Sequence, residues 1–139
     1  YSFGRLYGFL EYHYNGAGAS DASSYDDLFS TPAYVDGAVF LFGRHYITPG
    51  ASFQLTPLTT ILGSVLVNMN DPSALVAISI DHNFREDVSL ELGAYIGAGG
   101  APVLSSYSPA TVDSNARLTY ESEFGTYPDM YYASFRIYY

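Results

Sequence analysis

Three histidines are the side chains best suited to acid–base or metal chemistry in this chain, because it contains no cysteine. None of His13, His45 and His82 has a second ligand-type residue at a spacing used in metal sites. No serine accompanies His45 or His82 at a spacing that supports nucleophilic catalysis. We therefore expect no metal, no cofactor and no enzymatic activity, and we interpret the imidazoles as amphipathic groups near strand ends.

Two further features could bind ligands, and the sequence favours a simpler interpretation of each. Gly97, Gly99 and Gly100 are followed by no lysine and no predicted helix, which a phosphate-binding loop would require. The acids of the long connections do not follow the spacing of the calcium ligands in an EF-hand loop. They are therefore expected to form a hydrated surface rather than a cation site. These acids are Asp21, Asp26, Asp27, Asp36, Asp113, Glu121, Glu123 and Asp129.

Composition narrows the class of protein. The 139 residues suffice for one structural unit, residues 1–139. Charged residues make up 14%, against roughly 25% in soluble domains, while aromatic residues reach 17%. Nucleic acid is not an expected partner, because the net charge is -9 and few basic residues could neutralise phosphates. No apolar run approaches the roughly 18 residues that a spanning helix needs.

Alternation of apolar and polar residues with a period of two recurs along most of the chain and predicts β-strands. In residues 88–98 every even position is apolar. We count about six such segments, most of them near or above the roughly 9 to 11 residues that cross a bilayer as a tilted strand. They are residues 5–14, 39–55, 61–67, 76–84, 88–98 and 129–139.

The connections between these segments alternate in length. Residues 56–58 and 85–87 are tight turns, and residues 69–73 form a connection of middling length. The long surface loops are residues 15–36 and 99–128. Following the chain, both tight turns fall at one end of the strands and the three longer connections at the other, which is the layout of outer-membrane barrels.

Two fold classes share this alternation, a soluble β-sandwich and a membrane barrel. Strands longer than the usual five or six residues favour the barrel, as do the aromatic residues near strand ends and the one-sided loop lengths. The sequence therefore predicts an all-β fold, an antiparallel transmembrane β-barrel, with the soluble sheet as the alternative.

The C-terminal segment carries a family resemblance. The alternating Tyr131, Ala133, Phe135 and Ile137 and the final aromatic Tyr139 resemble the closing strand of Gram-negative outer-membrane β-barrel proteins. The resemblance implies that Tyr131, Phe135, Ile137 and Tyr139 form an assembly signal. It also implies location in the outer membrane of a Gram-negative bacterium, with the lipid bilayer and lipopolysaccharide as partners, and often a pore.

The number of strands departs from that family, since single-chain bacterial barrels begin at about eight. A turn near Pro49 could split residues 39–55, or residues 116–124 could add a strand. We favour a C-terminal fragment of a larger barrel whose earlier strands lie upstream or in another chain, because the alternation runs unbroken through Pro49. A homo-oligomer, in which several identical chains share one barrel, is a further option.

Polar side chains of the phase opposite to the apolar one are expected to face the inside of the barrel. In a wide barrel they would contact water and solutes, whereas in a barrel of about eight strands they would fill the interior. The expected lumen-lining residues are Arg5, Glu11, His13, Arg44, Gln54, Ser64, Asn68, Asp81, Glu91, Tyr95 and Arg136.

Hairpin geometry predicts a charged cluster within that set. If the residues flanking the turn 85–87 pair, Asp81 faces Glu91, and two facing carboxylates destabilise a sheet unless a cation lies beside them. Arg136 reaches the depth of Glu91 on the final strand, and Arg5 is a further candidate. The cluster would either set ion selectivity or fix the strand register, and we favour the second role because mixed charges give a weak field.

The functional expectation is a porin-like passive channel for small solutes in the outer membrane. The alternative is a non-conducting barrel that serves as an anchor or scaffold for a partner protein, which would bind the long acidic loops.

Overall fold

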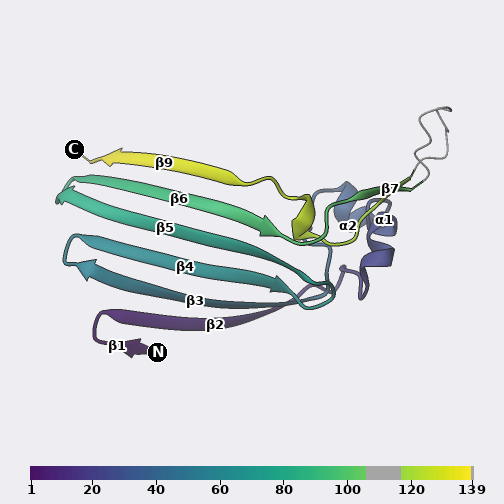
Figure 1. Cartoon of the computed structure of the whole chain (residues 1–139), viewed down its shortest axis with the longest axis horizontal. Helices are drawn as coiled ribbons and strands as arrows, with labels where there is room; N and C mark the ends of the chain where they lie inside the picture. The colour runs from purple at the N-terminus through teal and green to yellow at the C-terminus, as the bar shows by residue number, and fades with distance from the viewer. Residues whose placement is uncertain (106–116, 139) are drawn as a thin grey trace.

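The computed structural model describes residues 1–105 and 117–138. Six long antiparallel strands and one two-residue edge strand form a single open sheet in the order β1-β2-β3-β4-β5-β6-β9 (Figure 1). Their bounds are β1 Ser2–Phe3, β2 Leu6–Tyr14, β3 His45–Thr56, β4 Thr59–Asn68, β5 Ser73–Arg85, β6 Val88–Ala98 and β9 Met130–Ile137. The prediction of about six antiparallel strands is confirmed, but they form an open sheet and β2 does not pair with β9.

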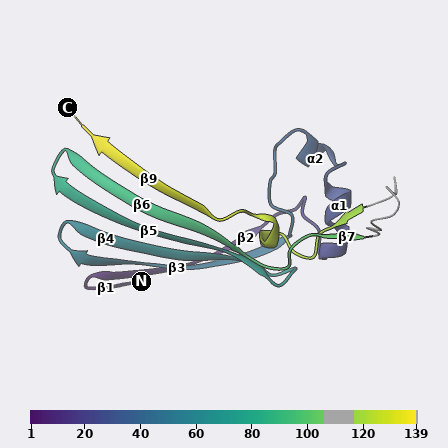
Figure 2. The same cartoon turned by 45° about the horizontal axis from the view of Figure 1, so that its top comes forward.

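Short elements occupy the two long connections and gather at one end of the strands, whereas the tight turns lie at the other end (Figures 1 and 2). We call these ends the loop end and the turn end. The β2–β3 connection contains η1 Ala22–Ser24, α1 Tyr25–Leu28 and α2 Pro32–Val35, and the β6–β9 connection contains β7 Val103–Ser105, β8 Arg117–Thr119 and η2 Phe124–Thr126. The strand considered within residues 116–124 is therefore only β8, which pairs with β7 in a separate two-stranded sheet. None of the helices described here is long and apolar enough to cross a membrane.

Two tight turns set the register of the long strands. Residues 57–58 join β3 to β4 and residues 86–87 join β5 to β6, where the sequence predicted turns. A register shift at the end of β5 makes Arg85, rather than the flanking Phe84, the partner of Val88. Beyond that shift the β5–β6 ladder is regular, so side chains of one phase stay on one face of the sheet.

One predicted strand begins later than expected. The alternation of residues 39–55 predicted one strand, but β3 starts at His45. The residues before it belong to the β2–β3 connection and pack against its helical part, where the Phe42 ring lies edge-on against Tyr25 with centroids 5.5 Å apart. The apolar residues there serve this cluster rather than a strand ladder. Within β3 the chain passes through Pro49 without a turn, as the unbroken alternation indicated.

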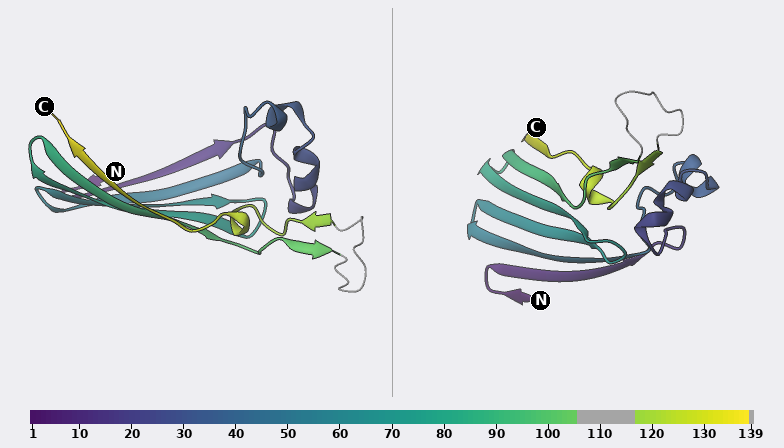
Figure 3. Two further views of the ribbon diagram at one scale, coloured as in Figure 1. Left: turned by 90° about the horizontal axis from the view of Figure 1, so that it is seen from above. Right: turned by 45° about the vertical axis from the view of Figure 1, so that its right-hand side comes forward.

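The fully buried apolar side chains lie mostly at the loop end rather than over the sheet. One cluster centres on Ala19, Tyr25 and Leu28, with Phe42 and Tyr120 packed against it. Seen from the side, the sheet is a single curved layer along most of the length of its strands (Figure 3). A single layer leaves both faces of a sheet open, so the chemistry of each face decides what covers it.

Candidate functional site

One face of the sheet is apolar across all six long strands. Direct cross-strand partners on this face include Ile61 with Ile80 and Ile80 with Leu92. Large side chains stay exposed on it, for example Leu10 at 68% and Phe135 at 60%. This apolar face consists of the even residues of 6–14, the odd residues of 47–55 and 61–67, the even residues of 74–82 and 88–98, and the odd residues of 131–137.

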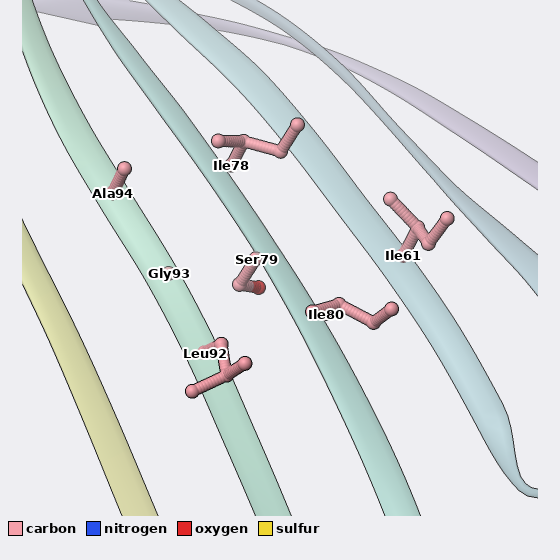
Figure 4. A pocket seen from close by; sticks show the side chains of 7 residues that line it. All are labelled: Ile61, Ile78, Ser79, Ile80, Leu92, Gly93 and Ala94. Carbon is pink, nitrogen blue, oxygen red and sulfur yellow. The ribbon is translucent and has the colours of Figure 1, made fainter.

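Three neighbouring strands surround a shallow hollow of about 350 Å³ in the apolar face (Figure 4). Ile61 comes from β4, Ile78 and Ile80 from β5, and Leu92 from β6. None of the seven residues that line the hollow is charged. Such a surface suits hydrocarbon chains and offers no ionic group for a polar solute.

Each end of the apolar face carries a histidine bonded to a neighbouring hydroxyl. At the loop end the Tyr12 hydroxyl lies 2.7 Å from His45 Nδ1, and at the turn end Thr59 Oγ1 lies 2.9 Å from His82 Nδ1. The His82 ring also packs edge-on against Phe84, with centroids 4.7 Å apart. In the described part of the chain neither imidazole has a hydrogen bond or ion pair with an acidic side chain of the kind that orients a catalytic histidine.

The opposite face, which we call the polar face, carries most of the predicted lumen residues. Small and polar residues dominate it, although Leu62, Leu66 and Leu75 share its phase. Arg5 and Arg44 lie in connections rather than in strands. The register brings together on this face Glu11, His13, Gln54, Ser64, Asp81, Glu91, Tyr95 and Arg136, with Asn68 at its loop end.

The predicted contact between Arg136 and Glu91 is present in the structure. Asp81 is the direct partner of Glu91, as the hairpin geometry indicated. The Arg136 guanidinium donates to Glu91 Oε2 as an ion pair, and the Tyr132 hydroxyl donates to Glu91 Oε1 at 2.8 Å. Arg5 instead donates to a backbone carbonyl of β3 and does not join the pair. Glu91 thus has a cation and a hydroxyl beside it, which offsets repulsion from Asp81.

Aromatic rings cover two glycines of the polar face. The Tyr132 ring lies over Gly93, its direct partner on β6, and the Phe9 ring lies over Gly50 on β3. A side chain at either glycine would overlap the ring. Each ring therefore leans across the neighbouring strand, over the glycine opposite it.

A buried network of carboxylates, hydroxyls and amides fastens the connections to the loop end of the polar face. The Glu123 side chain is fully buried and accepts from the Tyr46 hydroxyl at 2.5 Å and from Asn68 Nδ2 at 2.7 Å. It also accepts from the backbone amides of Phe42 at 3.0 Å and Gly43 at 3.4 Å. These donors come from the β2–β3 connection, β3 and β4, so one carboxylate joins three parts of the chain.

A second buried carboxylate, Asp71, completes the network. Its Oδ2 accepts from the Tyr25 hydroxyl at 2.5 Å, from Asn68 Nδ2 at 3.0 Å and from the Glu123 amide at 2.9 Å. Ser73 donates to the other oxygen. Among the described residues, the donors to the two carboxylates are uncharged hydroxyls and amides, so neutral hydrogen bonds from this part of the chain compensate for their burial.

Burial is the main cause of the shifted pKa values of two groups in this network, Glu123 and Tyr25. It raises the pKa of the Glu123 carboxyl, against the opposing effect of the bonds from Tyr46, Phe42 and Gly43. Burial also raises the pKa of the Tyr25 phenol, and the bond to Asp71 acts in the same direction. The phenol therefore stays a donor at ordinary pH.

The buried network corrects one prediction, because Glu123 is not part of a hydrated acidic surface. Its donors are 55 to 81 residues away in the sequence, so local composition gave no sign of its burial. Gly97 and Gly99 were a usable signal, since the backbone of residues 124–125 and the Ser122 hydroxyl lie against them where a side chain would clash. Asp113 and Tyr139 lie outside the described residues.

Among the residues that the structure describes, no three His, Asp or Glu side chains are grouped so that they could hold a metal ion. Comparison with protein-family models, curated proteins and solved structures gives no match for the chain.

Proposed function

We propose that the chain forms part of the wall of a β-barrel in the outer membrane of a Gram-negative bacterium, where the barrel is a porin-like passive channel for small solutes. The observation that carries the proposal is the uncovered apolar face of the sheet. Soluble monomers rarely expose a continuous apolar surface over several strands. Lipid acyl chains could cover this face without leaving polar side chains buried and unbonded, because the side chains on it are mostly apolar.

The height of the apolar face supports a bilayer as its surroundings. Thr59 pairs with His82 at the turn end, and the Met69 amide donates to the His45 carbonyl at the loop end. From Thr59 to Met69 a strand rises roughly 33 Å, at about 3.3 Å per residue. At a tilt of about 40° this is roughly 25 Å, the height of the apolar band of outer-membrane barrels. The aromatic and imidazole side chains at both ends suit the headgroup level.

The polar face supports a water-filled interior. Ser64, Asp81, Glu91 and Arg136 share it, while the apolar face has no charged residue in the described strands except Arg85 at the turn end. This division matches the outward apolar and inward polar alternation of membrane barrels.

The proposal also requires further strands. Unpaired backbone groups are costly in a bilayer, so the outer edge of β9 and the part of β2 beyond its short pairing with β1 need partners. β2 runs toward the loop end and β9 toward the turn end, so an even number of added strands keeps the whole barrel antiparallel. Upstream strands, strands of another chain or further copies of this chain would supply them.

Conductance of the intact protein in planar lipid bilayers tests the proposal. We expect stepwise ionic currents from the reconstituted protein, and permeation of small sugars into vesicles that contain it. Protein that inserts into vesicles but passes neither ions nor sugars would contradict a channel.

That negative result would favour the second candidate, a non-conducting anchor or scaffold. The folded β2–β3 connection supports this alternative, because it exposes the apolar Phe29 and Val35 as well as the acidic Asp26 and Asp27 at the loop end. A partner protein could bind such a mixed surface.

A further inference from the structure

We propose that the Glu123 carboxylate is a clamp that holds the β2–β3 connection over the loop end of the polar face, and that this clamp limits the width of the channel opening. The inference rests on the proposed function, since an opening exists only if the polar face lines a channel.

One side of the clamp is its grip on the β2–β3 connection. Glu123 Oε1 accepts from the Phe42 amide at 3.0 Å, and Oε2 accepts from the Gly43 amide at 3.4 Å. Gly43 also lies so close to the Asn68 side chain that no larger residue would fit there. The carboxylate therefore fixes the last part of the connection at the point where it enters β3.

The other side of the clamp is the attachment of Glu123 to the sheet. Its own amide donates to Asp71 at 2.9 Å, and the next amide, that of Phe124, donates to Ser73 Oγ at 3.3 Å. The Phe124 ring is fully buried and packs edge-on against Tyr46 of the polar face, with centroids 6.3 Å apart. The residues that carry the clamp thus rest on β3 and on the start of β5.

The clamp is separable from a second attachment of the same connection. The Tyr25 hydroxyl donates to Asp71 at 2.5 Å, and this bond does not use Glu123. Within the connection, Asn15 Nδ2 donates to the Leu41 carbonyl at 2.8 Å. Removal of the Glu123 carboxylate should therefore weaken the attachment of Phe42 and Gly43 to the residues around Glu123, while the packing of Phe42 in the α1 cluster and the bond of Tyr25 to Asp71 remain. A connection that is held less tightly would leave the loop end of the polar face wider.

Amide exchange and conductance together test the clamp in the full-length protein in lipid bilayers. Glu123→Ala removes all four acceptor bonds, and Glu123→Gln keeps the shape but turns one oxygen into a donor that faces another donor. Glu121→Gln is the matched control, because this exposed acid lies two residues away in the same connection. The readouts are hydrogen exchange of residues 38–44 by mass spectrometry and single-channel conductance.

Within residues 38–44 we expect exchange of the Phe42 and Gly43 amides, which donate to Glu123, to accelerate at least tenfold in Glu123→Ala, less in Glu123→Gln and not in Glu121→Gln. Conductance should rise in the same order. Unchanged exchange in both Glu123 variants would overturn the clamp, and faster exchange with unchanged conductance would overturn its control of the opening. Wild-type protein that inserts without conducting would refute the proposed function and, with it, the effect on the opening, while the exchange data would still decide whether Glu123 holds the connection.

Discussion

Substitution of Gly93 by alanine tests how the polar face is packed. The added methyl group would overlap the Tyr132 ring, which lies on this glycine and donates to Glu91 at 2.8 Å. Overpacking costs about 1 to 3 kcal/mol, and displacement of the ring also weakens its hydrogen bond to Glu91. The lower entropy of the unfolded alanine chain returns about 0.4 to 1 kcal/mol. We therefore expect Gly93→Ala to lower the free energy of unfolding by about 2 kcal/mol.

Gly63→Ala is the matched control for this prediction, because Gly63 lies in β4 on the apolar face and nothing lies within 4 Å of the position of an added methyl group. It should be neutral or stabilising by up to about 1 kcal/mol. Urea unfolding in lipid vesicles can be followed by tyrosine fluorescence, since the chain has no tryptophan. In a Tyr132→Ala background the penalty at Gly93 should disappear. Equal stability of Gly93→Ala and Gly63→Ala would refute this description of the polar face.

Three further predictions follow from the two faces and the network. Leu92→Arg on the apolar face should cost roughly 2 to 4 kcal/mol or block insertion, whereas Ser79→Arg on the polar face should be much milder; a heat-modifiability gel that shows equal tolerance would refute the assignment of the faces. Arg136→Gln should cost less than about 1 kcal/mol, because its pair with Glu91 is partly exposed, and a reversal-potential shift at unchanged stability would instead indicate a selectivity role. Because burial raises the pKa of Glu123, the folded state binds the proton of this carboxyl more tightly than the unfolded state does. The stabilisation from that proton is therefore full below the ordinary pKa of 4.5 and is lost as pH rises through the raised pKa. Glu123→Gln should remove this pH dependence of the free energy of unfolding, and an unchanged pH profile would contradict the prediction.

The strands and their faces were predictable because alternation acts locally. The predicted segment 88–98 coincides with β6, and the pairing of Asp81 with Glu91 followed from the position of one turn. A shift of register by one residue would move every side chain to the other face, so the pattern itself constrains the pairing. The register shift near Phe84 lies at the strand end and left the pairing of Asp81 intact.

The buried network was not predictable in the same way. Glu123 resembles the other loop acids in composition, and its burial depends on donors that only the fold brings together. The burial of Asn68 was equally unpredictable. Its place in the alternation predicted a lumen-lining side chain, whereas the structure buries it between Glu123 and Asp71. The late start of β3 within the predicted segment 39–55 has the same cause, because Phe42 packs into the cluster of the β2–β3 connection. Contacts over long sequence distances leave little trace in one sequence.

The most direct test of the account is a cysteine scan of residues 76–81 in β5. The sequence has no cysteine, so each introduced cysteine would be the single site of labelling. Each single-cysteine variant would carry a nitroxide label in lipid vesicles, and its collision rates with oxygen and with a water-soluble nickel complex would be measured. The account predicts that labels at 76, 78 and 80 collide mainly with oxygen, which concentrates in lipid, and that labels at 77, 79 and 81 collide mainly with the nickel complex. Absence of this alternation, or its reversal, would contradict the claim that the apolar face of the sheet contacts lipid.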